Sequence, residues 1–537
     1  MRSMKKTLCL LLALVMVFAL AACGPSGTNN AANTEVPENS TNNANNAEPA
    51  KPQPQYGGVF HLAKTTSPTS LFPVYKSVNG GGYLTPCLET LGYQDPLTNE
   101  ITGRLVKEYT RDPETGNITC KLEEGVLFHD GSELTADVVK WNFEFMTENG
   151  QASSIYSAKV NVTGKYTFVL EFPAFHLDSA VALVTSICSQ KAYEEKGLDY
   201  CINHPVGTGP FKFVEYVPDL KIVYEKNENY WRKDDAGNQL PYLDRYQVDM
   251  VPSDTATQAF LNGQIDSIEQ AGAAQIQMIE AEGYTDQHRT TFTSYSMYGF
   301  APNTKVLDDV WADVNVRKAV MLYGINYEEL APLAGGKLAV VRHTFDADGA
   351  LCFNPDISGN YKYDLEKAKK MLADAGYPNG FSTTIYAQDT FKAFATALQN
   401  ALKPLGIEAS VELIKSADTR RSDGKTPGLF ISLQYAQWDV MSKPMTTIYN
   451  QKGTTQGKNI LFSDEYQALF NEASSYKTYE ERGAAAKKLM QKFFIDDCLY
   501  VVCYGRETNV YIRPDVHSSG CEIKMPSPAT TWKEQAK

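Results

Sequence analysis

The chain has 537 residues, of which 43% are hydrophobic and 21% charged, and its formal net charge is −13 at pH 7. This length allows roughly two to four domains, and the composition is typical of a soluble globular protein. The negative charge argues against a nucleic-acid partner, because binding nucleic acid needs clustered lysine and arginine. The 31 tyrosines suit a ligand cleft, since the ring packs while the hydroxyl forms hydrogen bonds, and they suit the surface of a secreted protein equally well.

The N-terminal residues have the pattern of a lipoprotein signal peptide. Basic residues precede an apolar stretch at 8–19, which is too short to cross a bilayer, because a spanning helix needs roughly 20 residues. Residues 20–23 read Leu-Ala-Ala-Cys and resemble a bacterial lipobox. We therefore expect residues 1–22 to be removed and Cys23 to carry lipid. The alternative is an ordinary signal peptide with a chance cysteine.

The segment that follows is expected to be a tether. Residues 24–55 are rich in Asn, Thr, Pro and Ala and contain almost no large apolar side chain. Such a segment buries too little surface to offset its ordering entropy, so we expect residues 23–55 to be a lipidated cysteine and a flexible linker. The anchor would hold the protein at the outer face of the bacterial cytoplasmic membrane.

From residue 56 onward, strand and helix patterns are mixed along the chain. Runs rich in strand-forming residues predict strands at 57–62, 119–122, 166–172, 211–217, 221–226 and 499–504. Apolar residues at helical spacing predict helices at 136–146, 316–323, 364–375, 463–476 and 479–494. Asp364 as N-cap and Gly376 just past the end give one helix a clear start and stop. This mixed order predicts α/β lobes, neither a solenoid nor a bundle.

Motifs for common enzyme chemistry are missing from the sequence. There is no GxSxG elbow, no GxxxxGK[ST] phosphate loop and no HExxH pair. The His129-Asp130-Gly131 segment is interpreted as a turn. No CxxC or zinc-ligand spacing occurs, so we expect no metal site, no cofactor and no enzymatic activity.

Eight cysteines remain outside the leader and Cys23. An extracytoplasmic location permits disulfides. Cys188 with Cys201 is the most plausible local pair, and the sequence alone leaves the pairing open.

Several blocks in order resemble a known family. They are KLEEGVLFHDG at 121–131 with LTADVV at 134–139, GTGPF at 207–211, NGQID at 262–266, YDLEKA at 363–368 and LADAGY at 372–377. This series resembles the extracellular solute-binding proteins of family 5, the peptide-, oligopeptide- and nickel-binding receptors of ABC importers. The blocks themselves are interpreted as structural turns and helices that identify the scaffold and do not bind the ligand.

The resemblance implies an α/β, two-lobed periplasmic-binding-protein type II fold with mixed sheets. Two hinge crossings are expected near 295–303 and 499–507, and an extra subdomain in the first lobe. The expected boundaries are lobe I at 56–297, its subdomain at about 85–200, lobe II at 298–502 and a C-terminal return to lobe I at 503–537.

The family also implies a function. A di- or oligopeptide would lie extended between two closing lobes, bound through its main chain, and would be delivered to the transmembrane permease subunits by a monomeric receptor. An oligosaccharide receptor on the same scaffold, with Tyr and Trp stacked on sugar rings, is the main alternative. A nickel receptor, a peptidase or other enzyme, and a structural surface lipoprotein are further alternatives.

One segment supplies candidate ligand-binding residues. Residues 429–439 read LFISLQYAQWD, an apolar strand that runs into an aromatic and acidic cluster. Peptide-binding relatives carry an Asp shortly after a Trp-containing strand end, and Asp439 matches it as the partner of the ligand's α-ammonium group. Tyr435 and Trp438 would wall the pocket. The alternative is that Asp439 caps a loop while Trp438 packs in the core.

Overall fold

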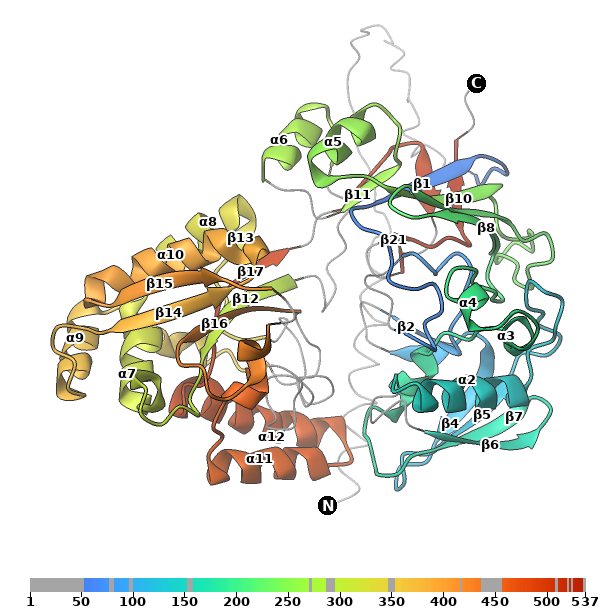
Figure 1. Cartoon of the computed structure of the whole chain (residues 1–537). Coiled ribbons are helices and arrows are strands. Elements are labelled where there is room, and N and C mark those ends of the chain that lie inside the picture. The colour runs from blue at the N-terminus through green and yellow to red at the C-terminus, as the bar shows by residue number, and fades with distance from the viewer. Residues whose placement is uncertain are drawn as a thin grey trace, which may run out of the picture. The chain divides into compact units, whose positions relative to one another are not determined.

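The computed structural model describes residues 53–76, 82–95, 100–151, 158–269, 273–285, 295–345, 353–415, 418–435, 456–507, 510–518, 521–522 and 525–534. Three sheets contain most of its strands (Figure 1). Within the described ranges, no helix combines the length and the apolar character needed to cross a membrane.

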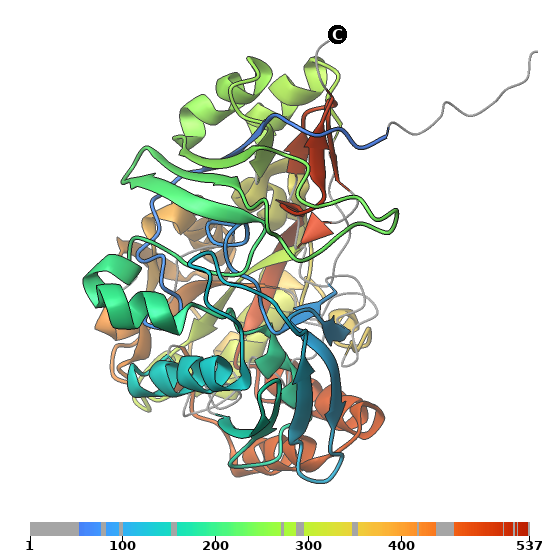
Figure 2. The ribbon, with the colours of Figure 1, turned by 90° about the vertical axis from the view of Figure 1, so that its right-hand side faces the viewer.

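The first sheet has six strands and is mixed. Its order is β18-β11-β1-β10-β9-β8, with β1 parallel to both β10 and β11. Alternate residues such as Phe60 and Tyr246 are buried on one face, while helices α5 and α6 pack with Ile268 and Tyr511 on the other. Figure 2 shows the red C-terminal strands beside this sheet. The bounds are β1 Val59–Lys64, β8 Phe211–Val217, β9 Lys221–Lys226, β10 Arg245–Met250, β11 Ser267–Glu269, β18 Val510–Ile512, α5 Ser253–Leu261 and α6 Ala273–Ala281.

The second sheet also has six strands, in the order β13-β17-β12-β16-β14-β15. Strand β12 is antiparallel to its neighbours β16 and β17, whereas β14 is parallel to β15 and β16. The bounds are β12 Tyr295–Pro302, β13 Ala339–Val340, β14 Ser382–Ala387, β15 Glu408–Leu413, β16 Leu429–Tyr435 and β17 Val501–Glu507.

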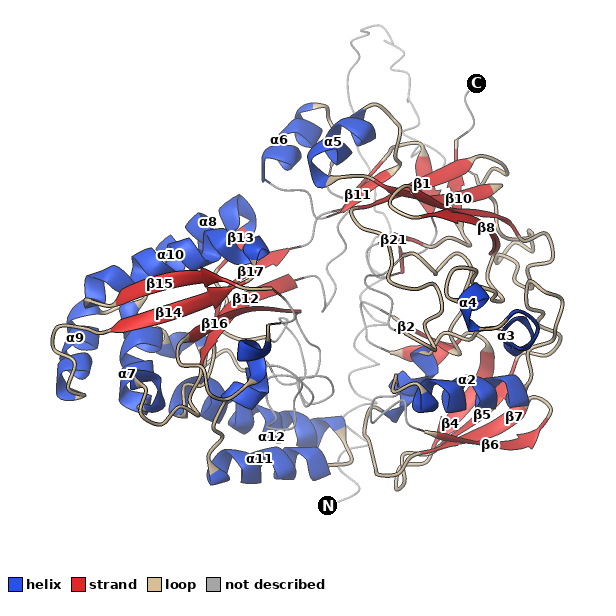
Figure 3. Cartoon of the chain, viewed as in Figure 1, coloured by secondary structure: helices blue, strands red, loops and turns tan. Residues whose placement is uncertain are grey.

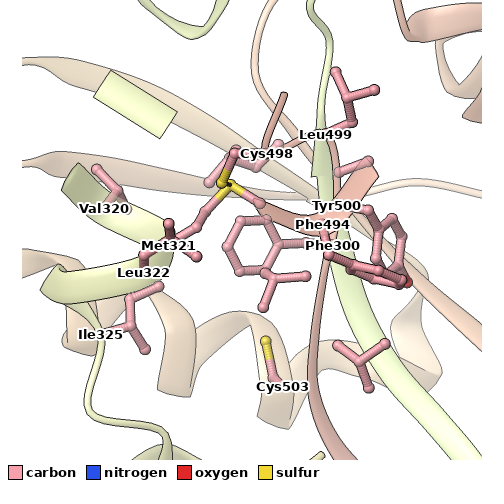
Figure 4. Close-up of a cluster of buried hydrophobic side chains, with 14 of the residues drawn as sticks. Phe300, Val320, Met321, Leu322, Ile325, Phe494, Cys498, Leu499, Tyr500 and Cys503 are labelled. Atoms are coloured by element: carbon pink, nitrogen blue, oxygen red, sulfur yellow. Dashed lines mark hydrogen bonds between the residues drawn. The ribbon is translucent and has the colours of Figure 1, made fainter. Parts of the chain in front are cut away.

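Helices pack around this second sheet and form with it the largest hydrophobic core of the described residues. The core joins Phe300 of β12 and Tyr500 beside β17 with Phe494, Met321 and Cys498, as Figure 4 shows. The helices are α7 Val314–Lys318, α8 Tyr327–Gly335, α9 Leu365–Asp374, α10 Lys392–Leu402, α11 Asp464–Ser475 and α12 Tyr479–Gln491.

A smaller four-stranded antiparallel sheet, β4-β5-β7-β6, forms a subdomain with helix α2 (Figure 3). Its core is separate from the other two and contains Leu122, Phe168 and, from α2, Phe143. The bounds are β4 Val106–Arg111, β5 Ile118–Leu122, β6 Lys159–Gly164, β7 Thr167–Glu171 and α2 Ala136–Glu148.

The other strands and α-helices of the described residues are short. They are the strand pairs β2 Gly92–Gln94 with β3 Ile101–Gly103, β19 Val516–Ser518 with β22 Thr531–Lys533, and β20 Cys521–Glu522 with β21 Met525–Pro526, and the helices α3 Gln190–Lys196 and α4 Leu198–Cys201.

The local elements predicted from the sequence are largely confirmed. The strand pair 211–217 and 221–226 has the predicted bounds, and the Asp364 side chain accepts a hydrogen bond from the Lys367 amide as the N-cap of α9. The first strand begins at Val59 and not at Gly57, because both preceding glycines have positive φ angles, 105° and 92°.

Cys188 and Cys201, the most plausible pair among those the sequence left open, do not form a disulfide. All six cysteines with described side chains are free and buried: Cys87, Cys120, Cys188, Cys201, Cys498 and Cys503. The Cys188 backbone is fixed on helix α2, since its amide donates to Asn142 Oδ1 at 2.9 Å and its carbonyl accepts from Asn142 Nδ2 at 3.0 Å. Burial raises the pKa of Cys87 and of Cys120 to about 12, which keeps these thiols protonated and unreactive.

Candidate functional site

Both large sheets have parallel strands that end at a common edge. In sheets of this kind, ligands bind outside the carboxyl ends of the parallel strands, where side chains of several loops converge. The two carboxyl edges are therefore candidate ligand-binding sites. Their last strand residues are Lys64, Met250 and Glu269 in the first sheet and Ala387, Leu413 and Tyr435 in the second.

An ion pair lies at the carboxyl edge of the first sheet. Lys64 Nζ is 2.9 Å from Glu269 Oε2, and the two side chains are only 16% and 22% exposed. They end the neighbouring strands β1 and β11. The arrangement places one positive and one negative group, both partly shielded from water, at the sheet edge. There they could interact with the terminal charges of a zwitterionic solute.

A cavity of about 490 Å³ opens beside the same edge. Its wall combines apolar side chains, among them Leu220 and Met250, with the His61–Asp249 pair, in which Nδ1 and Oδ2 are 2.8 Å apart. Gln247 Nε2 donates to the other oxygen of Asp249 at 2.6 Å, so this carboxylate is fully engaged in binding its neighbours. The described residues contain no group of three or more His, Cys, Asp and Glu side chains that could hold a metal ion.

The carboxyl edge of the second sheet carries the segment singled out from the sequence. Tyr435 is the last residue of β16, and its Cα pairs with Ser296 of β12, which in turn pairs with Arg506 of β17. Only two residues of the chain separate β17 from β18, which belongs to the first sheet, so β16 ends beside the strand from which the chain returns to the first sheet. Trp438 and Asp439, like Cys23, lie outside the described residues, and only the backbone of Tyr435 is placed. Their proposed roles stay predictions.

The strands next to Tyr435 are held rigidly. The rings of Tyr298 on β12 and Tyr504 on β17 stack with centroids 4.7 Å apart and planes 7° apart. Tyr500 lies against Gly299, where an added Cβ would be 2.6 Å from its ring, and its hydroxyl is 2.6 Å from that of Ser432. Close packing of this kind restricts β12, β16 and β17 to one position relative to each other, so we expect this edge of the sheet to be rigid.

Sequence reasoning missed Lys64, Glu269 and the Tyr298–Tyr504 pair. Lys64 and Glu269 each end a strand, and that position is the only signal for either residue along the chain. Lys64 and Glu269 come together only because β1 pairs with β11. This contact joins residues about two hundred positions apart, and neither segment alone predicts it.

Two mixed sheets with open carboxyl edges, connected through β12 and through β17 into β18, are the fold of a two-lobed solute-binding protein. The family model "Bacterial extracellular solute-binding proteins, family 5 Middle" matches residues 100–459. The chain belongs to this family of ABC-importer solute-binding proteins, which are extracytoplasmic.

Curated relatives and a solved structure agree with this assignment. The chain is 24% identical to the oligopeptide-binding protein AppA of Bacillus subtilis (strain 168) over 548 residues, 92% of each chain. It is 28% identical to heme-binding protein A of Haemophilus influenzae over 319 residues, which is 56% of this chain and about half, 54%, of that relative. The periplasmic binding protein DppA from Helicobacter pylori, in complex with the peptide STSA, superimposes with a TM-score of 0.70 at 22% identity, covering 90% of this chain and 99% of that one.

Proposed function

We propose that this protein is the lipid-anchored receptor of an ABC importer and captures peptides between its two lobes. The observation that carries the proposal is the similarity to a protein named as oligopeptide-binding over 92% of both chains. The fold match to a binding protein that holds a four-residue peptide supports it. Delivery to the permease and the absence of enzymatic activity follow from the same assignment.

The proposed lobe division follows the chain crossings. Lobe I would contain 56–297 with the subdomain at about 85–200, lobe II 298–502, and the return to lobe I 503–537. The position of β18 in the first sheet, paired with β11, and of β12 and β17 in the second supports this division. Closure would then occur by a change in the segments that join these strands.

In this proposal Asp439 holds the amino end of the peptide, with Tyr435 and Trp438 as walls. The position of Tyr435 at the carboxyl edge of three parallel strands supports it, because residues 436–439 follow directly. A carboxylate suits the role, since a charge-assisted hydrogen bond to an ammonium group contributes roughly 1.5–3 kcal/mol when water is excluded.

A ligand screen by thermal unfolding tests the proposal. The probes are Ser-Thr-Ser-Ala, a nonapeptide, glutathione, hemin, a maltooligosaccharide and Ni²⁺. A bound probe at 100 times its Kd stabilises the folded state by about 2.7 kcal/mol, so a peptide should raise the melting temperature measurably. Stabilisation by hemin alone would favour the second candidate, a heme receptor, which the similarity to heme-binding protein A suggests. A response to the oligosaccharide or Ni²⁺ alone would also contradict the peptide assignment.

The anchor is tested separately. Cys23→Ala should release the protein from the cell or leave an uncleaved precursor, whereas the native chain should carry lipid at Cys23. Mass spectrometry of the mature N-terminus decides, and an unmodified N-terminus at another residue would contradict the anchor.

A further inference from the structure

A polar contact joins the four-stranded subdomain to helix α12 of the second lobe. Asp178 stands immediately before the 3₁₀ helix η1 (Ser179–Val184), and its Oδ1 accepts a hydrogen bond from the Tyr479 hydroxyl at 2.8 Å. Its Oδ2 accepts from Arg482 Nη2. The Asp178 and Arg482 side chains are 304 residues apart in the chain, yet only 10% and 6% exposed.

The subdomain fixes the backbone at Asp178 without occupying its carboxylate. Arg111 donates to the Ser179 hydroxyl and to the His176 carbonyl, both at 3.0 Å, and the Ser179 hydroxyl donates to Gly116 O at 2.7 Å. Within the described ranges, every hydrogen-bond partner of the Asp178 carboxylate lies on α12. The acceptor is therefore held in place and aimed at the other lobe.

Helix α12 presents its two donors in an equally ordered way. The Thr478 side chain caps the helix by accepting from the Glu481 amide, so Tyr479 and Arg482 lie in the first turn. The guanidinium of Arg482 also lies 5.6 Å from the centroid of the Tyr479 ring. Both donors thus approach Asp178 from one capped helix end.

Weaker contacts extend the same junction. Lys477 forms an ion pair with Glu114 in the turn between β4 and β5, and its Nζ is 5.6 Å from the centroid of the Phe175 ring. Arg111 stacks against Phe175 at 5.2 Å. The Lys477 and Glu114 side chains are 45% and 76% exposed, so this outer pair contributes little compared with the buried one.

The junction can open without dismantling a core. The apolar core around helix α12 and the core of the subdomain are separate clusters with no residue in common. Charged and hydroxyl groups regain hydration when they separate, whereas an apolar interface would have to expose its surface to water. A directional, polar contact that joins the two lobes without sharing a core can therefore form and break reversibly.

We propose that Asp178, Tyr479 and Arg482 form a latch that stabilises the closed arrangement of the two lobes and slows ligand release. The latch rests on the proposed function, because it needs lobes that open and close. A latch touches no ligand, yet it raises the fraction of molecules in the binding-competent form, and apparent affinity increases in proportion to that fraction.

Variants of the full chain test the latch. Asp178→Asn keeps the side-chain shape but removes the charge, Tyr479→Phe removes one hydrogen bond at a partly exposed ring, and Arg482→Gln removes the other donor. The control is Asp374→Asn, which removes an exposed ion pair with Lys370 inside helix α9. Small-angle scattering without ligand reports lobe opening, and stopped-flow release of a fluorescent Ser-Thr-Ser-Ala peptide reports dissociation.

Asp178→Asn is expected to increase the radius of gyration and to speed peptide release about tenfold, the factor that corresponds to about 1.4 kcal/mol. Tyr479→Phe should have a smaller effect of the same sign, and Asp178→Asn with Arg482→Gln together should add little to either alone, because both act on one contact. Asp374→Asn should change neither quantity.

An unchanged radius and an unchanged release rate in Asp178→Asn and Tyr479→Phe would overturn the latch. A lower melting temperature at an unchanged radius would assign Asp178 a purely structural role and would overturn it as well. If the radius grows in these variants but no peptide binds the native chain, the latch stands and the peptide assignment fails.

Discussion

The carboxylate of Glu89 accepts a hydrogen bond from the indole nitrogen of Trp231 at 2.9 Å. The same carboxylate accepts from the Tyr230 hydroxyl at 2.7 Å and from the Thr208 hydroxyl at 3.0 Å, and Glu89 is 2% exposed. One buried charge thus joins the loop at 207–210 to the Tyr230-Trp231 segment. The family block at 207–211 and the Tyr230-Trp231 segment therefore meet at a residue that the sequence analysis did not single out.

Replacement of Glu89 should destabilise the first lobe. Glu89→Gln keeps the shape of the side chain but places an amide NH₂ group against the Trp231, Tyr230 and Thr208 donors. We therefore expect a loss of about 1–3 kcal/mol in the free energy of unfolding, and a larger loss for Glu89→Ala. Urea unfolding measures both. The control Glu108→Gln alters a side chain that is 70% exposed and should have almost no effect. Equal stabilities for the Glu89 and Glu108 variants would show that the three hydrogen bonds contribute nothing.

Gly209, in the block at 207–211, packs so closely against the backbone of Cys87 that a side chain does not fit there. Its amide donates to Cys87 O at 2.9 Å, and an added Cβ would stand 2.6 Å from the carbonyl carbon and oxygen of Cys87. Backbone atoms cannot move aside as a flexible side chain does. Gly209→Ala should therefore cost several kcal/mol, on the order of 3, or prevent folding. Gly359→Ala, where an added Cβ meets nothing within 4 Å, is the matched control in a thermal melt. A Gly209→Ala chain as stable as the control would contradict the close approach.

Buried histidines should make the protein less stable in mild acid. His343 is 8% exposed, stacks on Tyr361 at 4.0 Å, and burial lowers its pKa to about 4. In the unfolded chain it titrates near 6.5, so between pH 6.5 and pH 4 the unfolded state binds the extra proton. Stability that is fully present above pH 6.5 is then lost at about 1.4 kcal/mol per pH unit as the pH falls.

Urea unfolding at pH 7, 6 and 5 measures this slope. His343→Phe keeps a ring for Tyr361 to stack on and cannot be protonated, so its stability should fall less steeply with acid than that of the native chain. His517→Phe is the control, because His517 pairs with Glu534 at a more exposed position. Parallel curves for the native and His343→Phe chains would show that His343 is not buried as a neutral ring.

The sequence predicted local structure well wherever a local signal exists. Asp364 with Gly376 marks helix α9, because capping depends on neighbouring residues. Runs of strand-forming residues likewise mark β8 and β9. Strand order could not be predicted in this way. The pairing of Ser267 with Ile512 joins residues 245 positions apart, and nothing in either segment specifies the partner.

The candidate site residues show the same difference between local and long-range signals. Asp439 came from a resemblance confined to one segment, whereas the Lys64–Glu269 pair and the Asp178–Arg482 contact depend on tertiary structure. A charged residue at the end of a strand is common on protein surfaces. Only the fold shows that Lys64 and Asp178 each have a partner far along the chain.

The amino anchor gives the sharpest test of the proposed ligand. Asp439→Asn should weaken binding of a free-amino peptide such as Ser-Thr-Ser-Ala by about tenfold or more, since loss of a charge-assisted bond to the α-ammonium group costs about 1.4 kcal/mol or more. The N-acetylated peptide has no ammonium group and should bind the native chain and the variant nearly equally. Isothermal titration of both peptides against the native chain, Asp439→Asn and the control Asp374→Asn measures the difference. Equal losses for both peptides, or no loss for either, would place the amino anchor at another residue. The Lys64–Glu269 pair at the carboxyl edge of the first sheet would then be the next to vary, by Glu269→Gln.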